Sequence, residues 1–185
     1  INAGSNRQIC IGDSTELNAT GGEVYSWLPL DSLLTPGNDS TFAWPQDTTI
    51  YYVLAIDSNG CSNLDSVIVI VNPLPVIVAG NDVQICLGDT ALLTAAGGEQ
   101  YTWSPVVNLS YPGNDSTLAW PSDTISYLVS GVDSNACSNT DVVIVVVNPL
   151  PLTNAGLDTA SCKNTPVVLG GNPTGPDLAN YLWSP

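Results

Sequence analysis

The chain of 185 residues carries 17 acidic side chains, two basic side chains and no histidine, for a formal net charge of −15. This charge repels nucleic acid and anionic membrane surfaces, so we expect neither as a partner. No apolar stretch approaches the roughly 18 residues that a membrane-spanning helix requires, and we expect no membrane span. Valine, threonine, tyrosine and tryptophan are frequent and no helical apolar period persists, which predicts an all-β fold.

The sequence repeats itself at a distance of 76 positions. Residues 1–75 superimpose on residues 77–151 without a gap, and roughly three in five aligned positions are identical, which indicates tandem modules. A third copy begins near Leu152 and stops before its second half. We expect repeat 1 over residues 1–75, repeat 2 over 76–151 and the N-terminal part of a truncated repeat 3 over 152–185, all within an excerpt of a longer exported protein.

Strands are expected where short β-branched and aromatic runs lie between turn residues. In repeat 1 these runs are Asn2–Ile11, Thr15–Thr20, Glu23–Leu28, Ser40–Trp44, Thr49–Ile56 and Ser66–Val71, and repeat 2 carries them 76 positions later. Positions that are identical in both copies alternate with positions that differ, as one buried strand face predicts. Six or seven short strands of this kind favour a small two-sheet sandwich.

A tight turn is predicted between the last two strands of each module. Asp57–Gly60 has the composition of a hairpin turn. Its counterpart in repeat 2 ends in Ala136 instead of glycine, where a positive φ would cost about 1 kcal/mol.

The last strand of each module ends in a stiff tetrapeptide. Asn72–Pro75 returns unchanged as Asn148–Pro151. Proline offers no N–H to a strand ladder, fixes φ and pushes the preceding residue into an extended conformation. We therefore expect a linker of constant length and angle between modules, formed by Asn72, Pro73, Pro75, Asn148, Pro149 and Pro151.

Three motifs of the modules resemble a known family. The opening Cys10-x-Gly-Asp, the strand Tyr25-x-Trp27-x-Pro29 and the hairpin Asp57-Ser-Asn-x-Cys61 before a valine-rich strand are similar to PKD-like, immunoglobulin-like repeats. Such repeats occur in large surface and secreted proteins of Bacteroidota, including gliding-motility adhesins. The resemblance implies Ig-like β-sandwich modules strung end to end, exported by a type IX system, that serve as a stalk or an adhesive surface.

The five cysteines are spaced regularly, with alternating gaps of 51 and 25 positions. A module of about 75 residues buries little surface, so a disulfide is expected to stabilise it. We favour pairing within modules, which leaves Cys162 with a partner outside the chain. The alternative pairing crosses the linker, and disulfides of either kind indicate export to an oxidising space. The favoured bonds are Cys10–Cys61 and Cys86–Cys137, and the alternative bonds are Cys61–Cys86 and Cys137–Cys162.

The acidic residues offer little catalytic chemistry. No nucleophile has a histidine base, and every candidate acid pair recurs once per module, so we do not expect an enzyme. We expect no cofactor and no firm metal site. Asp57 and Asp133 are weak calcium candidates because their carboxylates lie near turns, and Asx turns at loop corners are the alternative that we favour.

Eleven of the fourteen aspartates are followed directly by serine or threonine. In nine of these the next residue is apolar or threonine, which is similar to the O-glycosylation signal of exported Bacteroidota proteins. Turn preference combined with duplication is the alternative explanation. The candidate O-glycosylation sites are Ser14, Ser32, Ser40, Thr48, Ser66, Thr90, Ser116, Thr124 and Thr159.

The aromatic residues have two interpretations. Tyr25, Trp27 and Tyr51 alternate along strands and are expected to pack in the core. Trp44 and Trp120 each precede a proline at a strand end. We favour core or inter-module packing for these two tryptophans, and an exposed platform for sugar stacking is the alternative.

These patterns together predict a non-enzymatic extracellular repeat protein that forms a stiff stalk, adhesin or filament on the bacterial cell surface. The alternative is a carbohydrate-binding accessory region of a secreted enzyme. The expected partners are further repeats of the same chain, other copies in a fibre, and surface glycans or polysaccharide.

Overall fold

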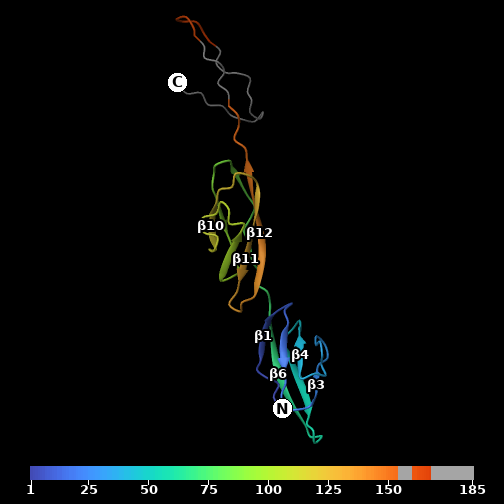
Figure 1. Cartoon of the computed structure of the whole chain (residues 1–185). Coiled ribbons are helices and arrows are strands. Elements are labelled where there is room, and N and C mark those ends of the chain that lie inside the picture. Colours follow the sequence, from blue (N-terminus) through green and yellow to red (C-terminus); the bar gives the residue numbers. More distant parts are fainter. Residues whose placement is uncertain (154–159, 168–185) are drawn as a thin grey trace.

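The structure is a computed structural model that describes residues 1–153 and 160–167 (Figure 1). Within these residues it contains strands and no helix, so no described helix is long and apolar enough to cross a membrane. Two modules lie end to end along one axis. Of the predicted third repeat, residues 152–185, the structure describes only residues 152, 153 and 160–167.

The first module is a sandwich of two sheets. One sheet has the order β1-β6-β5-β3 and the other pairs β2 with β4. Strand β1 runs parallel to β6, whereas the other neighbours are antiparallel. Its strands are β1 (Arg7–Cys10), β2 (Thr15–Asn18), β3 (Val24–Leu28), β4 (Ser40–Ala43), β5 (Thr49–Ile56) and β6 (Ser62–Asn72).

The second module repeats this arrangement. Its larger sheet has the order β7-β12-β11-β9, its smaller sheet pairs β8 with β10, and β7 runs parallel to β12. Its strands are β7 (Val83–Cys86), β8 (Ala91–Thr94), β9 (Gln100–Ser104), β10 (Ser116–Ala119), β11 (Ile125–Val132) and β12 (Ser138–Asn148). The prediction of an all-β fold with tandem β-sandwich modules end to end is confirmed.

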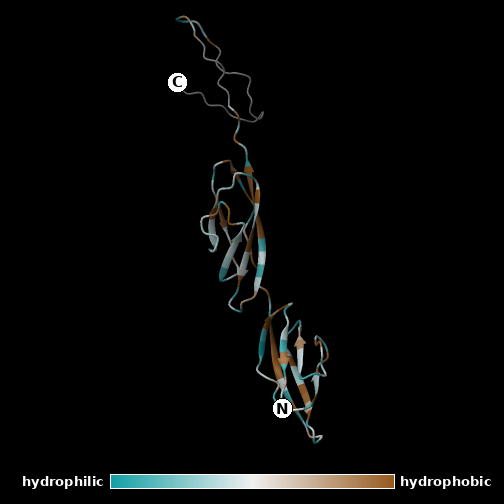
Figure 2. Cartoon of the chain, in the orientation of Figure 1, coloured by the Kyte–Doolittle hydropathy of each residue, from teal (hydrophilic) through white to brown (hydrophobic). Residues whose placement is uncertain are grey.

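The observed strands overlap the predicted runs, and the largest differences lie at the starts of β1 and β6. Strand β1 begins only at Arg7, because the residues before it make a single bridge between Asn2 and Thr20. Strand β6 begins four residues earlier than predicted, because Ser62 already pairs with Ile56 across the hairpin. The long last strand is hydrophilic near this hairpin and hydrophobic towards the linker, as β12 shows in Figure 2.

The core of each module is formed by the positions that are identical in both repeats. Tyr51 and Val53 of β5 are fully buried, whereas Tyr52 and Leu54, which alternate with them, are exposed. Trp27 is also fully buried, and its indole N–H donates to the Asn38 carbonyl at 3.0 Å, so the polar atom of this core side chain is satisfied. Core packing is therefore confirmed for Trp27 and Tyr51.

The first residues of each module are attached to its last strand by an aspartate. The Asp65 carboxylate accepts the backbone N–H of Ala3 at 2.8 Å, and Asp141 accepts that of Ala79 in the same way. These N–H groups hold the pKa of both carboxyls below the usual aspartate range. A lowered folded-state pKa stabilises the fold above the unfolded value, so this contribution is present at neutral pH and is lost as the pH falls through the lowered pKa.

Candidate functional site: the joint between the modules

The upper end of the first module is organised by Asn72, the last residue of β6. Its carbonyl accepts the N–H of Ile11 at 2.9 Å, and its side-chain amide donates to the Ile9 carbonyl at 3.2 Å. Both bonds hold the end of β1 beside the end of β6, where the linker starts. Because β1 and β6 are parallel, Cys10 lies opposite Asn72 and therefore at the joint.

The lower end of the second module is the hairpin between β11 and β12. The Asp133 carboxylate accepts the N–H groups of Asn135 and Cys137 at 2.9 and 2.8 Å, which closes the turn. Ala136 has a φ of 63°, the left-handed conformation for which its counterpart Gly60 is suited. The sequence prediction of a hairpin with a strained alanine in the second copy is thus confirmed.

A disulfide joins the two modules. Cys10 bonds Cys137, with 5.5 Å between the two Cα atoms. Beside it the Gln8 side-chain amide donates to the Asn135 side-chain oxygen at 3.2 Å. The two modules are therefore connected twice, once by the backbone linker and once by this bond, which we call the joint disulfide.

The favoured pairing within modules is wrong. Cys10 and Cys61 lie at opposite ends of the first module, because β1 ends at the joint whereas Cys61 follows the hairpin turn at the far end. Cys137 is bonded to Cys10, so it pairs neither with Cys86 nor with Cys162. The alternative pairing is wrong as well, because Cys61, Cys86 and Cys162 are free and exposed.

The linker packs against the second module. Pro75 is buried, and its carbonyl accepts the side-chain amide of Asn139 at 3.0 Å. The Val76 carbonyl lies so close to Gly97 that a Cβ there would collide with it, and Gly97 has a φ of 94°. Only glycine fits both conditions, which explains the glycine at position 97. Pro73 is exposed, so the linker residues predicted as spacers divide between solvent and the second module.

The corresponding residues after β12 are Asn148, Pro149 and Pro151, and all three are exposed. The Asn148 side chain donates to the Ile85 carbonyl at 3.4 Å, as Asn72 does to Ile9. The end of β12 therefore has the same local construction as the end of β6.

A polar hollow of about 500 Å³ lies at the joint. It is lined by β1 and the loop that follows, including Asp13 and Ser14, and by Asn135 and Ala136 of the second module's hairpin. Ser14 is exposed and is one of the predicted glycosylation sites. The joint thus brings a candidate modification site beside the joint disulfide.

The structure places the other described candidate glycosylation sites on loops and at strand ends, except Ser66, which lies within β6 and pairs with Tyr52. Ser66, Thr90 and Ser116 are exposed, whereas Ser32 and Ser40 are half-buried. Thr48 and Thr124 are exposed, but their hydroxyl oxygens accept the N–H groups of Val71 and Val147. Thr159 lies outside the described residues.

The weak calcium candidates serve the hairpin turns. One oxygen of Asp57 accepts the N–H groups of Cys61 and Asn59, and these donors, that of Cys61 above all, lower the pKa of its carboxyl. Asp133 makes the same two backbone bonds in the second module. In the part of the chain that the structure describes, no three metal-binding side chains converge. Both carboxylates are thus in the Asx turns that we favoured.

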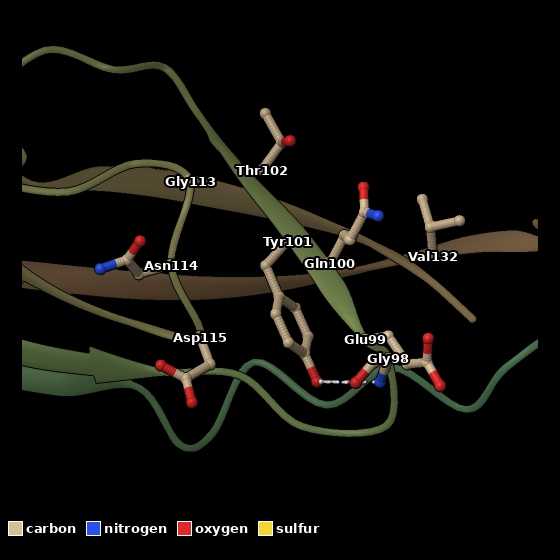
Figure 3. Close-up of a pocket in the computed structure, with 9 residues that line it drawn as sticks. All are labelled: Gly98, Glu99, Gln100, Tyr101, Thr102, Gly113, Asn114, Asp115 and Val132. Carbon is tan, nitrogen blue, oxygen red and sulfur yellow. Dashed lines mark hydrogen bonds between the residues drawn. The ribbon is translucent and has the colours of Figure 1, made fainter. Parts of the chain in front are cut away.

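Two further features of the surface are a hollow on the second module and the exposed rings of Trp44 and Trp120. A hollow of about 570 Å³ on the second module is lined by Glu99, Tyr101 and Asp115 among others, and the Tyr101 hydroxyl both accepts from and donates to Gly98 (Figure 3). Trp44 and Trp120 are 38% and 45% exposed. Our expectation that these two tryptophans pack in the core or between modules is wrong, because each follows the buried alanine that ends its strand and therefore points to the outer face.

Comparisons with known proteins agree with this architecture. Residues 1–73 match the family model described as Ig-like domain CHU_C associated. The first module is therefore similar to the Ig-like domains of this family, and the second module repeats its strand order. Ig-like domains of this kind are non-catalytic modules and are typical of extracellular and cell-surface proteins.

Several solved structures are similar to the chain. The insect immune protein hemolin is 15% identical, with a TM-score of 0.40, 80% of this chain covered and 46% of hemolin covered. The first two Ig domains of DIP-gamma are 12% identical, with a TM-score of 0.37 and coverage of 80% and 95%. The PKD domain from the KIAA 1837 protein is 20% identical, with a TM-score of 0.33 and coverage of 39% and 84%. A search of curated protein sequences found no match.

Proposed function

We propose that this chain is part of a non-enzymatic, exported repeat protein whose modules form a stiff stalk, adhesin or filament on the bacterial cell surface. The observation that carries the proposal is the disulfide between Cys10 and Cys137, which crosses from one module to the next beside a proline linker. A role in gliding motility and assembly into fibres with other copies belong to the same proposal and follow from the resemblance to surface repeats.

The joint explains why such an array would be stiff. Two modules connected by one flexible linker normally move relative to each other, unless a large interface holds them. Here a second covalent connection at Cys10 and a buried Pro75 remove much of this freedom. The net charge of −15 adds repulsion between modules, which favours an extended array. A disulfide that persists also requires an oxidising space, which supports export.

Residual dipolar couplings test the stiffness of the joint. In the oxidised protein both modules should fit one common alignment tensor. In the variant Cys10→Ser/Cys137→Ser each module should stay folded but require its own tensor, because only the linker remains. The variant Cys61→Ser/Cys86→Ser is the matched control, since it removes two cysteines and keeps the joint disulfide. Independent tensors in the oxidised protein, or a common tensor in both variants, would refute the proposal.

We also propose that exposed sites such as Ser14, Ser66 and Thr90 carry O-linked sugars, which would shield a surface poor in lysine. Their exposure and their position after an aspartate support this proposal. The intact mass of native protein should exceed that of protein made in a heterologous host. Native material at the bare peptide mass would rule it out.

A second candidate function rests on Trp44 and Trp120. These exposed rings occur at the same place in both modules, each before a proline, and an exposed indole can stack on a sugar ring. Binding to a glycan array that is lost on replacing both tryptophans by alanine would favour a carbohydrate-binding accessory region over a stalk.

A further inference from the structure

Two of the free cysteines lie at opposite ends of the pair of modules. Cys61 follows the β5–β6 hairpin at the outer end of the first module, and Cys86 ends β7 at the outer end of the second. When the two repeats are aligned with a shift of 76 positions, Cys61 is equivalent to Cys137 and Cys10 is equivalent to Cys86. Each free cysteine is therefore the repeat equivalent of one half of the joint disulfide.

The surroundings of the bonded cysteines are repeated as well. Gln8, which binds Asn135 across the joint, corresponds to Gln84, and Asn135 corresponds to Asn59. The turn that presents Cys61 is closed by Asp57 in the way that Asp133 closes the turn of Cys137. The outer ends of the pair thus carry the same polar and thiol groups that meet at the joint.

Equivalent cysteines differ in solvent exposure according to whether a neighbouring module covers them. Cys137 is fully buried against the first module, whereas its equivalent Cys61 is exposed. Cys10 is half-buried, whereas its equivalent Cys86 is exposed. The difference between equivalent residues therefore arises from the module that covers them.

We propose that Cys61 and Cys86 are the open halves of further joint disulfides and that the partner of each is another copy of this repeat, placed end to end. Cys86 takes the hairpin cysteine of a following copy, and Cys61 takes the β1-type cysteine of a preceding copy. This inference rests on the geometry of the joint and goes beyond the proposed stalk, because it fixes the partner and the direction of assembly.

The bond forms by oxidation of two thiols. Two protons and two electrons leave the thiols as the S–S bond forms, and a small disulfide such as oxidised glutathione accepts them and becomes two thiols.

A mechanical consequence follows for an array in which every joint is closed. The 25 positions from Cys61 to Cys86 run from the lower end of one module to the upper end of the next, mostly as β6 and β7. Each such segment joins two disulfides, so an array would contain two parallel covalent paths. Such a segment extends to at most roughly 80–90 Å, and its strands are already extended, so the array would resist lengthening.

The experiment uses the full chain with the substitution Cys162→Ser. A second molecule of the same variant supplies the other copy of the repeat. Unlabelled and ¹⁵N-labelled protein are mixed at high concentration and equilibrated with oxidised and reduced glutathione. Cleavage before aspartate then places Cys61 in the peptide 57–64 and Cys86 in the peptide 82–88. Mass spectrometry of the linked peptides reports both the partner and, from the isotope mixture, whether it comes from another molecule.

We expect the Cys61–Cys86 link between molecules to exceed the Cys61–Cys61 and Cys86–Cys86 links by at least about tenfold, since matching end faces raise the effective concentration of the correct pair. Replacement of Gln84 by alanine should reduce this preference. The inference is overturned if the three links form in random proportions, or if both cysteines stay reduced or bound to glutathione. The same digest reports the Cys10–Cys137 link separately, so failure of the inference is distinguishable from failure of the joint itself.

Discussion

When the oxidised chain is pulled from its two ends until it is fully stretched, it should be shorter by roughly 430 Å than the reduced chain. The reason is the position of the joint disulfide, which connects residues separated by 127 positions and so removes the backbone between them from the covalent path that bears the load. Most of both modules would then be protected from unfolding by force.

Single-molecule force spectroscopy with tags at both ends measures this difference before and after addition of a reductant. The variant Cys10→Ser is the control, because it should reach full length in either buffer. Pairing within modules would instead hide two separate loops of 51 residues, or roughly 170 Å each. Two hidden lengths of that size, or an oxidised chain that reaches full length, would contradict the joint disulfide.

Replacing Trp103 by alanine should lower the unfolding free energy of the second module by about 3–5 kcal/mol, as large-to-small changes of a buried tryptophan do. Trp103 is fully buried, and its indole N–H donates to the Asn114 carbonyl at 3.0 Å, so the change leaves both a cavity and an unpaired acceptor. For a small domain this is a large part of the whole stability.

The matched control is Trp120→Ala in the same module, because that side chain is 45% exposed and should contribute within about 1 kcal/mol. Urea unfolding followed by amide NMR signals separates the two modules, and the first module should unfold as in the parent chain apart from coupling through the joint. Equal losses for both variants would show that the core is not organised around Trp103.

Much of the fold could be predicted from the sequence because the two copies differ in an informative way. Tyr51 and Val53 are kept in the second copy whereas Tyr52 and Leu54 are not, and only the kept residues are buried. The same alternation of buried and exposed residues predicts the orientation of Trp44. Thr41 and Ala43 point inward, so Trp44 at the next position had to point outward.

The pairing of the cysteines could not be predicted in this way. Regular spacing is compatible with several pairings of the cysteines. The actual pairing depends on whether β1 runs parallel or antiparallel to β6, and the alternation of buried and exposed residues along a strand does not reveal this direction. The parallel pairing of these strands puts Cys10 at the joint and leaves Cys61 at the far end. The sequence pattern indicates a spacer role for Asn72, and the bonds of this residue to Ile9 and Ile11 show that it also positions Cys10.

The most direct test of the joint is a map of the disulfides in the protein under non-reducing conditions. Cleavage before aspartate places every cysteine on a peptide of its own, with Cys10 in residues 1–12 and Cys137 in residues 133–140. The structure predicts that these two peptides are linked to each other. Links of Cys10 to Cys61 and of Cys86 to Cys137 would contradict it, because each module would then be closed on itself and the joint would be held by its proline linker alone.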